Sequence, residues 1–146
     1  MTTLEEKSLG AVLKGGTSAV RQVVDYAEHP VEKGLIIMDS PAHDAVCVTG
    51  MIATGAQVVV FTTGRGTPLG AATAPVIKVS SNSGIYNIMN DNIDLDAGTI
   101  LEADESIESV GERIFQEIIE VASGELTKAE LLGHREFALY SLGLSV

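Results

Sequence analysis

Short apolar runs along the chain alternate with segments whose apolar residues recur at helical spacing. Three of the runs are bounded by Gly, Pro or polar residues, which is typical of buried strands. The predicted strands cover residues 34–38, 57–61 and 75–79. Strands that alternate with helices predict an α/β fold. We expect a three-layer, Rossmann-like variant of it with a mostly parallel central sheet.

Helical spacing and capping residues predict five helices around these strands. In the first of them, Val and Ala recur at i, i+3, i+4 and i+7, and His29-Pro30 ends the pattern. The predicted helices cover residues 17–29, 40–54, 82–89, 104–123 and 125–135. The remaining segments are residues 1–16, which show no clear period, an acidic connector at 90–96, and an apolar tail at 137–142 that predicts an edge strand.

The composition predicts one folded domain and excludes some partners. The chain has 146 residues, of which 45% are hydrophobic, which is enough for a sizeable core. Its net charge of −11 argues against nucleic acid and anionic membranes, because both are bound through basic surfaces. Its one cysteine, Cys47, excludes a disulfide within the chain. No stretch of 18 apolar residues occurs, and we expect a cytoplasmic protein.

Loops that leave the carboxyl ends of parallel strands are candidate ligand sites. Three such loops follow the predicted strands, at residues 39–44, 62–70 and 80–82. The second is dense in Gly and hydroxyl groups, but its glycines have the spacing GxGxxxG and it lacks the Lys of a phosphate-binding loop. Pro75 also follows too soon for a phosphate-binding helix. A nucleotide site is therefore not favoured.

Arg65 lies between two glycines of this loop, beside Thr62 and Thr63. A guanidinium group pairs with a carboxylate through two parallel hydrogen bonds, and Gly lets backbone N–H groups approach a ligand. The pattern fits a small-anion site as well as it fits a tight turn with a solvated Arg. Both interpretations stay open.

Other polar residues also have two interpretations. His43 is either a surface residue at a helix start or an acid, base or metal ligand. Cys47 is either an inert thiol or a soft ligand to iron. Asp91, Asp94 and Asp96 form either an acidic loop or a divalent-cation site, although they lack the spacing of an EF-hand.

Several segments, taken in order, carry a resemblance to one family. The most specific is Phe61-Thr-Thr-Gly-Arg-Gly-Thr-Pro-Leu-Gly70. The others are Thr2–Gly10, Lys14–Gly16, Lys33–Leu35, Pro75–Lys78, Asp94–Gly98, Val110–Gly111 and Val121–Gly124. Together they resemble the altronate and galactarate dehydratases, a family that includes the large subunit of sulfolactate sulfo-lyase. Those enzymes are longer, so the resemblance implies that residues 1–146 form a single C-terminal domain that works with upstream domains.

The family removes water from a sugar acid to give a 2-keto-3-deoxy acid, and it depends on iron. The resemblance therefore implies a small sugar acid as substrate and Fe²⁺ as cofactor, and it is compatible with a homo-oligomer. It implies that substrate binds at Thr62, Thr63, Gly64, Arg65 and Gly66. The isolated domain is expected to be inactive or nearly so, because the resemblance places the other catalytic groups upstream.

The resemblance also changes the interpretation of three further residues. Glu5 and Lys7 would ordinarily be a solvated charge run, but they fall in the matched N-terminal stretch and become candidate catalytic residues. Cys47 falls where altronate and galactarate members also have Cys, which implies a metal ligand whose partner ligands lie outside this chain.

Other positions depart from the sugar-acid members and leave the substrate open. His43 stands where those members have Ser, and Asp96 stands where they usually have Asn, so a catalytic role for His43 is not implied. Three functions remain. They are dehydration of altronate or galactarate, carbon–sulfur cleavage of sulfolactate, and binding of a small anion or assembly without chemistry.

Overall fold

The computed structural model describes residues 3–140, apart from the side chains of Lys7 and Ala11. The helices in this range are α1 (Leu4–Leu13), α2 (Asp44–Ala53), α3 (Ser83–Ile88), α4 (Thr99–Glu102), α5 (Ile107–Ala122) and α6 (Lys128–Leu131). The strands are β1 (Val20–Val24), β2 (Leu35–Met38), β3 (Val59–Thr63), β4 (Val76–Ser80) and β5 (Leu95–Asp96). Within this range no helix is long and apolar enough to cross a membrane.

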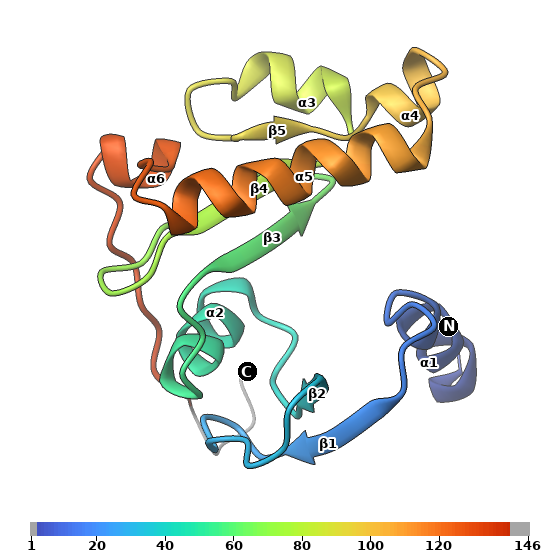
Figure 1. Cartoon of the computed structure of the whole chain (residues 1–146), viewed down its shortest axis with the longest axis vertical. Coiled ribbons are helices and arrows are strands. Elements are labelled where there is room, and N and C mark those ends of the chain that lie inside the picture. Colours follow the sequence, from blue (N-terminus) through green and yellow to red (C-terminus); the bar gives the residue numbers. More distant parts are fainter. Residues whose placement is uncertain (1–2, 141–146) are drawn as a thin grey trace.

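The larger sheet has the parallel order β3-β4-β5 (Figure 1). Its central strand β4 is buried at every residue. Because successive side chains of a strand point to opposite faces, β4 contributes to two separate cores. Val76 packs with Val48 of α2 on one face, and Ile77 and Val79 pack with Val121 of α5 on the other. The sheet therefore lies between two helical layers.

The smaller sheet has two parallel strands, β1 and β2, and packs against α2. The contact is close because Gly50 of α2 has no side chain. A Cβ at Gly50 would lie 2.9 Å from Cζ of Tyr26 and 3.0 Å from Cε of Met38. The α/β class is thus confirmed, but the strands form two small sheets in place of the one central sheet that we expected. The Rossmann-like arrangement is not confirmed.

The predicted helix over residues 17–29 is wrong, because this segment holds strand β1. The spacing of Val20, Val23 and Val24 fits both structures, but β-branched residues favour a strand, and Leu35–Met38 offers a parallel partner. The segment is fixed further by Gln22, whose side-chain oxygen accepts hydrogen bonds from two backbone N–H groups of residues 31 and 32, both at 3.0 Å.

Several other boundaries differ from the predictions. Helix α1 lies in the segment without a clear period, where Thr3 and Glu6 exchange the two hydrogen bonds of a capping box. Strand β5 lies in the predicted acidic connector. Helix α2 begins at Asp44, and Ser106 caps α5 in place of Asp104. The predicted edge strand is absent at residues 137–140, and its last two residues lie outside the described range.

The segment after α6 crosses from the larger sheet to the smaller one. The backbone N–H of Gly70 donates to the Glu136 carboxylate at 2.9 Å, and the N–H of Ala138 donates to the Thr49 hydroxyl at 3.2 Å. The ring of Tyr140 then stacks on Tyr26, with ring centroids 4.6 Å apart. This C-terminal strap, residues 133–140, therefore contacts the β3–β4 connection, α2 and the smaller sheet.

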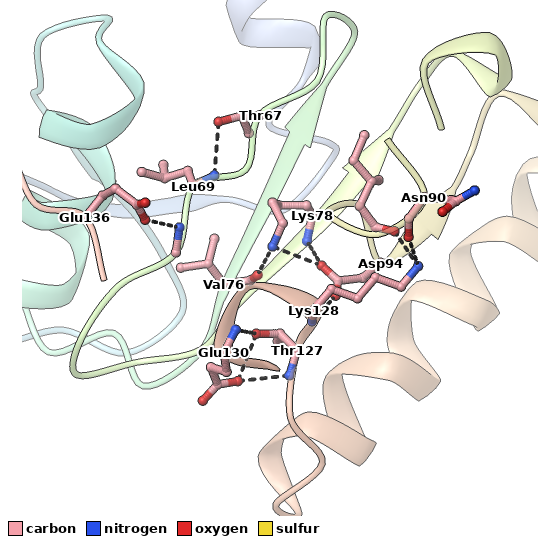
Figure 2. A network of polar contacts seen from close by, with 12 residues as sticks. Thr67, Leu69, Val76, Lys78, Asn90, Asp94, Thr127, Lys128, Glu130 and Glu136 are labelled. Atoms are coloured by element: carbon pink, nitrogen blue, oxygen red, sulfur yellow. Dashed lines mark hydrogen bonds and ion pairs between the residues drawn. The ribbon is translucent and has the colours of Figure 1, made fainter. Parts of the chain in front are cut away.

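A buried ion pair lies within the larger sheet. Lys78 of β4 has no exposed side-chain surface, and its Nζ lies 3.3 Å from Oδ2 of Asp94, whose side chain is 3% exposed. The same oxygen accepts the Lys78 backbone N–H at 2.6 Å, and Lys78 Nζ also donates to the carbonyl of Val76 at 3.1 Å (Figure 2). Burial lowers the pKa of Lys78, although Asp94 opposes this shift.

The second oxygen of Asp94 reaches helix α6. Its Oδ1 accepts the backbone N–H of Lys128 at 2.8 Å. The Lys128 ammonium donates to the carbonyls of Asn90 and Ile93, both at 2.7 Å, and α6 begins with a capping box between Thr127 and Glu130 (Figure 2). One carboxylate thus joins β4, the loop before β5, and α6.

We expect Asp94→Asn to lower the free energy of unfolding by about 3–5 kcal/mol, because it leaves the Lys78 ammonium buried without a counter-charge. Lys78→Met is expected to cost less, because the Asp94 carboxylate keeps its two backbone donors. Urea unfolding of both variants measures these changes. Asp91→Asn, in the same loop but exposed, is the matched control. Equal stabilities of the Asp94 and Asp91 variants would contradict a structural role for the pair.

Candidate functional site

The carboxyl edge of the larger sheet brings three loops together. Strands β3, β4 and β5 are parallel and in register, and they end at Thr63, Ser80 and Asp96. The loops that follow these residues therefore start at one edge of the sheet, which is where open parallel sheets bind ligands. We call this edge, with residues 62–66, 81–83 and 97–99, the carboxyl-edge site.

Loop 62–66 is shaped by its contact with α3. The backbone N–H of Gly66 donates to the Thr63 hydroxyl at 3.0 Å, which closes a tight turn. Gly66 has φ +81°, and a Cβ there would overlap the sulfur of Met89 and lie 3.0 Å from Ile85. Gly is therefore required at this position by conformation and by packing. A tight turn was one of the two interpretations that the sequence left open.

Arg65 is presented to solvent at the tip of this turn. Its side chain is exposed, and among residues 3–140 it forms no ion pair or hydrogen bond. Thr62 and Gly64, which precede Arg65, are also exposed, whereas Thr63 and Gly66 are half-buried. Within residues 3–140 the loop thus presents a cation to solvent, which fits both interpretations of the sequence.

The other side of the site is packed by small residues. Ser80 is buried, and its hydroxyl donates to the carbonyl of Asn82 at 2.9 Å. The Asn82 side chain caps α3 by accepting the N–H of Ile85 at 3.1 Å. Gly98, after β5, lies so close to Ser83 that a Cβ would come within 2.6 Å of the Ser83 hydroxyl. Among the described residues, this hydroxyl is buried without a hydrogen-bond partner.

The end of β5 is held by an ion pair. Arg113 of α5 donates to the Asp96 carbonyl at 2.8 Å and pairs with Glu105 at 2.9 Å. Glu105 also accepts hydrogen bonds from the hydroxyls of Thr99 and Ser109, at 2.6 and 2.7 Å. Hydrogen bonds from Thr99, Ser109 and Arg113 lower the pKa of Glu105 to about 2.

Sequence analysis missed most of the polar groups that support this edge. Lys78, Ser83 and Arg113 were not candidates, and Asp94 was considered only as part of an acidic loop or a cation site. A signal existed for Lys78, because a Lys inside an otherwise apolar buried strand needs a carboxylate partner. The acidic cluster is not a cation site as built, since Asp94 binds Lys78 and Asp96 accepts the N–H of Gly98 at 2.8 Å.

The candidate catalytic residues lie elsewhere. Glu5 is exposed on α1, which stands apart from the end of β3 in Figure 1. Lys7 is on the same helix, but its side chain is not among those that the structure describes. Within residues 3–140 no hydrogen bond or ion pair joins Glu5 to loop 62–66. The structure therefore does not bring Glu5 together with Arg65, and the catalytic roles of Glu5 and Lys7 stay predictions.

Cys47 lies on α2, one residue after the contact of this helix with Tyr26, a residue that lines a cavity. It is half-buried, and Tyr26 donates to the carbonyl of the preceding residue at 2.8 Å. Burial raises the pKa of Tyr26, and Cys47 and Tyr140 add to the shift. The cavity, of about 510 Å³, lies at the carboxyl ends of β1 and β2. It is lined by Asp25, Tyr26, Asp39, Ser40, Pro41 and Tyr140.

The metal-ligating residues do not gather around Cys47. Within residues 3–140 no three His, Cys, Asp or Glu side chains lie close enough to hold a metal ion. His43 is exposed at the start of α2, and its side chain makes no capping bond. A role of Cys47 as ligand stays a prediction.

Comparison with known proteins matches nearly the whole sequence to one family. A family model described as "D-galactarate/Altronate dehydratase, C-terminal" matches residues 1–145. The chain belongs to the D-galactarate/altronate dehydratase family. The chain is 43% identical over 125 residues to galactarate dehydratase (L-threo-forming) of Escherichia coli. The aligned region covers 86% of this chain and 24% of that protein.

Two further relatives are named for other substrates. Altronate dehydratase of Bacillus subtilis is 38% identical over 146 residues, which is 100% of this chain and 29% of that protein. The beta subunit of (2R)-sulfolactate sulfo-lyase of Chromohalobacter salexigens is also 38% identical, over 97% of this chain and 37% of that protein. The dehydratase-family domain therefore spans about a quarter to a third of the length of these relatives.

We expect Gly98→Ala to lower the free energy of unfolding by about 1–3 kcal/mol, because the new methyl group would push α3 away from the end of β5. Gly111→Ala is the matched control, since Gly111 lies inside α5 with open space around it and Ala favours a helix by about 0.5–1 kcal/mol. Thermal unfolding measures both changes. A domain that tolerates Ala at both positions would not have the close packing described at Gly98.

The Glu105 cluster should make the domain sensitive to acid. A carboxyl group with a lowered pKa stabilises the fold above its ordinary value of 4.5, and this contribution is lost as the pH falls toward 2. We therefore expect wild type to lose more stability than Glu105→Gln between pH 4.5 and 2. Urea unfolding at a series of pH values measures the difference. Glu112→Gln, at an exposed position on α5, should follow the wild-type profile, and the prediction fails if Glu105→Gln does so too.

Proposed function

We propose that this domain binds the substrate carboxylate in a longer enzyme that removes water from altronate or galactarate to give a 2-keto-3-deoxy acid. One observation carries the proposal. Arg65 is held between two glycines at the carboxyl edge of a parallel sheet, exposed, and without a partner within residues 3–140. The names of two relatives supply the substrate class, because they are a galactarate and an altronate dehydratase.

The residues of the loop suit an anion that carries hydroxyl groups. The Arg65 guanidinium offers two parallel N–H donors to a carboxylate, and the hydroxyls of Thr62 and Thr63 can donate to or accept from the hydroxyls of a sugar acid. The exposed backbone of Gly64 lets the ligand approach the chain. Because the whole chain has a net charge of −11, an anionic substrate is attracted by this local group and not by the general field.

The proposed reaction removes a proton next to the carboxylate and expels the neighbouring hydroxyl. Binding of the carboxylate by Arg65 stabilises the negative charge that builds up on it when the proton leaves. A base must take the proton, and an acid must assist the departing hydroxyl. Glu5 and Lys7 are the candidates of this chain for those two roles. Their position on α1, apart from the Arg65 loop, requires that the active site include further parts of the enzyme.

Iron is the cofactor that the resemblance implies. The residues of this domain do not fit a complete iron site, since no three ligating side chains gather within residues 3–140. Cys47 is half-buried and is this domain's candidate ligand. The other ligands would have to come from the rest of the enzyme, and we assign no step of the reaction to the metal.

A second candidate function is the cleavage of a carbon–sulfur bond in sulfolactate. It is favoured by the 38% identity to the beta subunit of (2R)-sulfolactate sulfo-lyase, which covers 97% of this chain. The same carboxylate-binding loop would serve both reactions, because each begins with loss of a proton beside a carboxylate. The two differ in the group that leaves, water or sulfite.

The test replaces the matching 29% of Bacillus subtilis altronate dehydratase by this domain and measures turnover of the chimera. We expect Arg65→Ala to raise KM for the sugar acid about 10- to 100-fold, the effect of losing a charged pair worth about 1.5–3 kcal/mol. Arg65→Lys should recover part of the loss, because Lys keeps the charge without the fork. Arg135→Ala removes another exposed Arg and is the control.

The same assay separates the candidate functions. Altronate, galactarate and sulfolactate are supplied in turn, and the product is identified as a 2-keto-3-deoxy acid or as sulfite. Unchanged KM and kcat in Arg65→Ala would overturn the proposed role of the loop. Release of sulfite, without dehydration of either sugar acid, would replace the first candidate function by the second.

A further inference from the structure

One face of the smaller sheet has no cover in the described structure. The register pairs Val24 with Met38 and Val23 with Ile37, so the two pairs point to opposite faces. Val24 is 3% exposed, and Met38 lies against Gly50 of α2. On the opposite face, Val23 is 65% exposed and Ile37 is 48% exposed. Helix α2 therefore covers one face, and the other presents aliphatic side chains to solvent.

A sheet in this state is incomplete by the ordinary rules of protein architecture. Parallel sheets occur almost only where both faces are covered, because their strands are apolar on both sides. Sheets of two strands are also marginally stable unless other elements pack on them. The β1–β2 sheet is parallel, has two strands, and has aliphatic residues on both faces. Its open face is therefore expected to pack against another element.

Helix α1 carries a second exposed apolar surface. It directly precedes β1 and stands apart from both sheets in Figure 1. Leu4, Leu9, Val12 and Leu13 are between 67% and 82% exposed. Three of these residues, Leu4, Leu9 and Val12, line a shallow groove of about 370 Å³ along the helix. Solvated helices are polar on their outer face, so this one has an apolar side that is not used within residues 3–140.

Charged residues are distributed unevenly between the segment that holds α1 and β1 and the rest of the chain. Residues 1–36 contain four of the nine basic residues but only five of the twenty acidic ones, so nearly all of the net charge of −11 lies in the rest of the chain. Protein interfaces are depleted in charged residues and enriched in apolar ones at their centre. The nearly neutral N-terminal region therefore has the charge that the centre of an interface requires.

The length of the relatives identifies the element that covers this region. The chain corresponds to 24%, 29% and 37% of the three relatives, and the matched family region is described as C-terminal. The additional polypeptide of those relatives thus precedes the matched region and reaches it beside the position of α1. A second copy of this chain is a poorer occupant, because two acidic molecules repel each other.

We infer that the open face of β1–β2, with Val23 and Ile37, and the apolar side of α1 form the surface on which the preceding part of a full-length enzyme of this family packs. We call it the N-terminal docking surface. This inference rests on one part of the proposed function, namely that the domain works within a longer enzyme. It also places α1, with Glu5 and Lys7, at the junction between this domain and the rest of the enzyme.

The first experiment compares the isolated chain with the Bacillus subtilis chimera by hydrogen–deuterium exchange. We expect the amides of residues 20–24 and 35–38 to exchange at least about tenfold more slowly in the chimera, because the open face becomes covered. The amides of α5, a helix that does not belong to the docking surface, should exchange at similar rates in both proteins. Equal exchange of the β1–β2 amides in the two proteins would overturn the inference.

The second experiment uses Val23→Asp in both proteins. Val23 is solvent-exposed in the isolated chain, so the Tm of that chain should change little, whereas the Tm of the chimera should fall. Leu101→Asp is the matched control, because Leu101 is 84% exposed on α4 and lies outside the docking surface. Its effect should be equally small in both proteins. An equally small effect of Val23→Asp in both contexts would contradict the inference.

Two further measurements separate this inference from its alternatives. Light scattering of the isolated chain should give the mass of a monomer. A dimer that Val23→Asp dissociates would show that a second copy covers the surface, and it would overturn the inference. Arg65→Ala should leave the exchange protection of β1–β2 in the chimera unchanged, so failure of the substrate-binding proposal and failure of the docking surface give different results.

Discussion

The pairing of Lys78 with Asp94 is the interaction on which the larger sheet depends. An ammonium group without exposed surface is tolerated in β4 because one carboxylate meets its charge, and that carboxylate also accepts two backbone N–H groups. Asp94, in the loop that leads into β5, therefore binds both β4 and helix α6. Apolar packing alone would not set this geometry, because aliphatic contacts have no preferred direction whereas each of these bonds has one.

The carboxyl-edge site is built on this fixed sheet by close backbone approach. A Cβ at Gly66 would overlap Met89, the C-cap of α3, and a Cβ at Gly98 would overlap Ser83 of α3, so the absence of side chains decides how near the three loops come. Arg113 of α5, paired with Glu105, then holds the end of β5. The loop that carries Arg65 is thus exposed at its tip and tightly packed at its base. The backbone at Arg65 is therefore held by the packing of Gly66, while the charged side chain lies in solvent.

Local patterns predicted the parts of the fold that local forces decide. The apolar runs gave β2, β3 and β4, and capping residues gave α3 and α5 within a few residues. Val20–Val24 was ambiguous because its spacing fits a helix and its β-branched side chains fit a strand, and only pairing with β2 resolves this. Strand β5 was not predicted because two residues are too few to show an alternation of apolar and polar positions. In the site, the position of the Arg65 loop followed from the strand before it. Lys78, Asp94 and Ser83 could not be assigned, since their roles depend on contacts between residues distant in the sequence.

The stacking of Tyr140 on Tyr26 has a consequence for the order in which the chain folds. It joins two rings at nearly opposite ends of the described sequence, and the C-terminal strap between α6 and Tyr140 crosses the Gly70 region and α2 on the way. Contacts between residues so far apart close the largest loops of the chain and carry the largest entropic cost. We therefore expect the strap to form after both sheets have docked on α2, among the last events of folding.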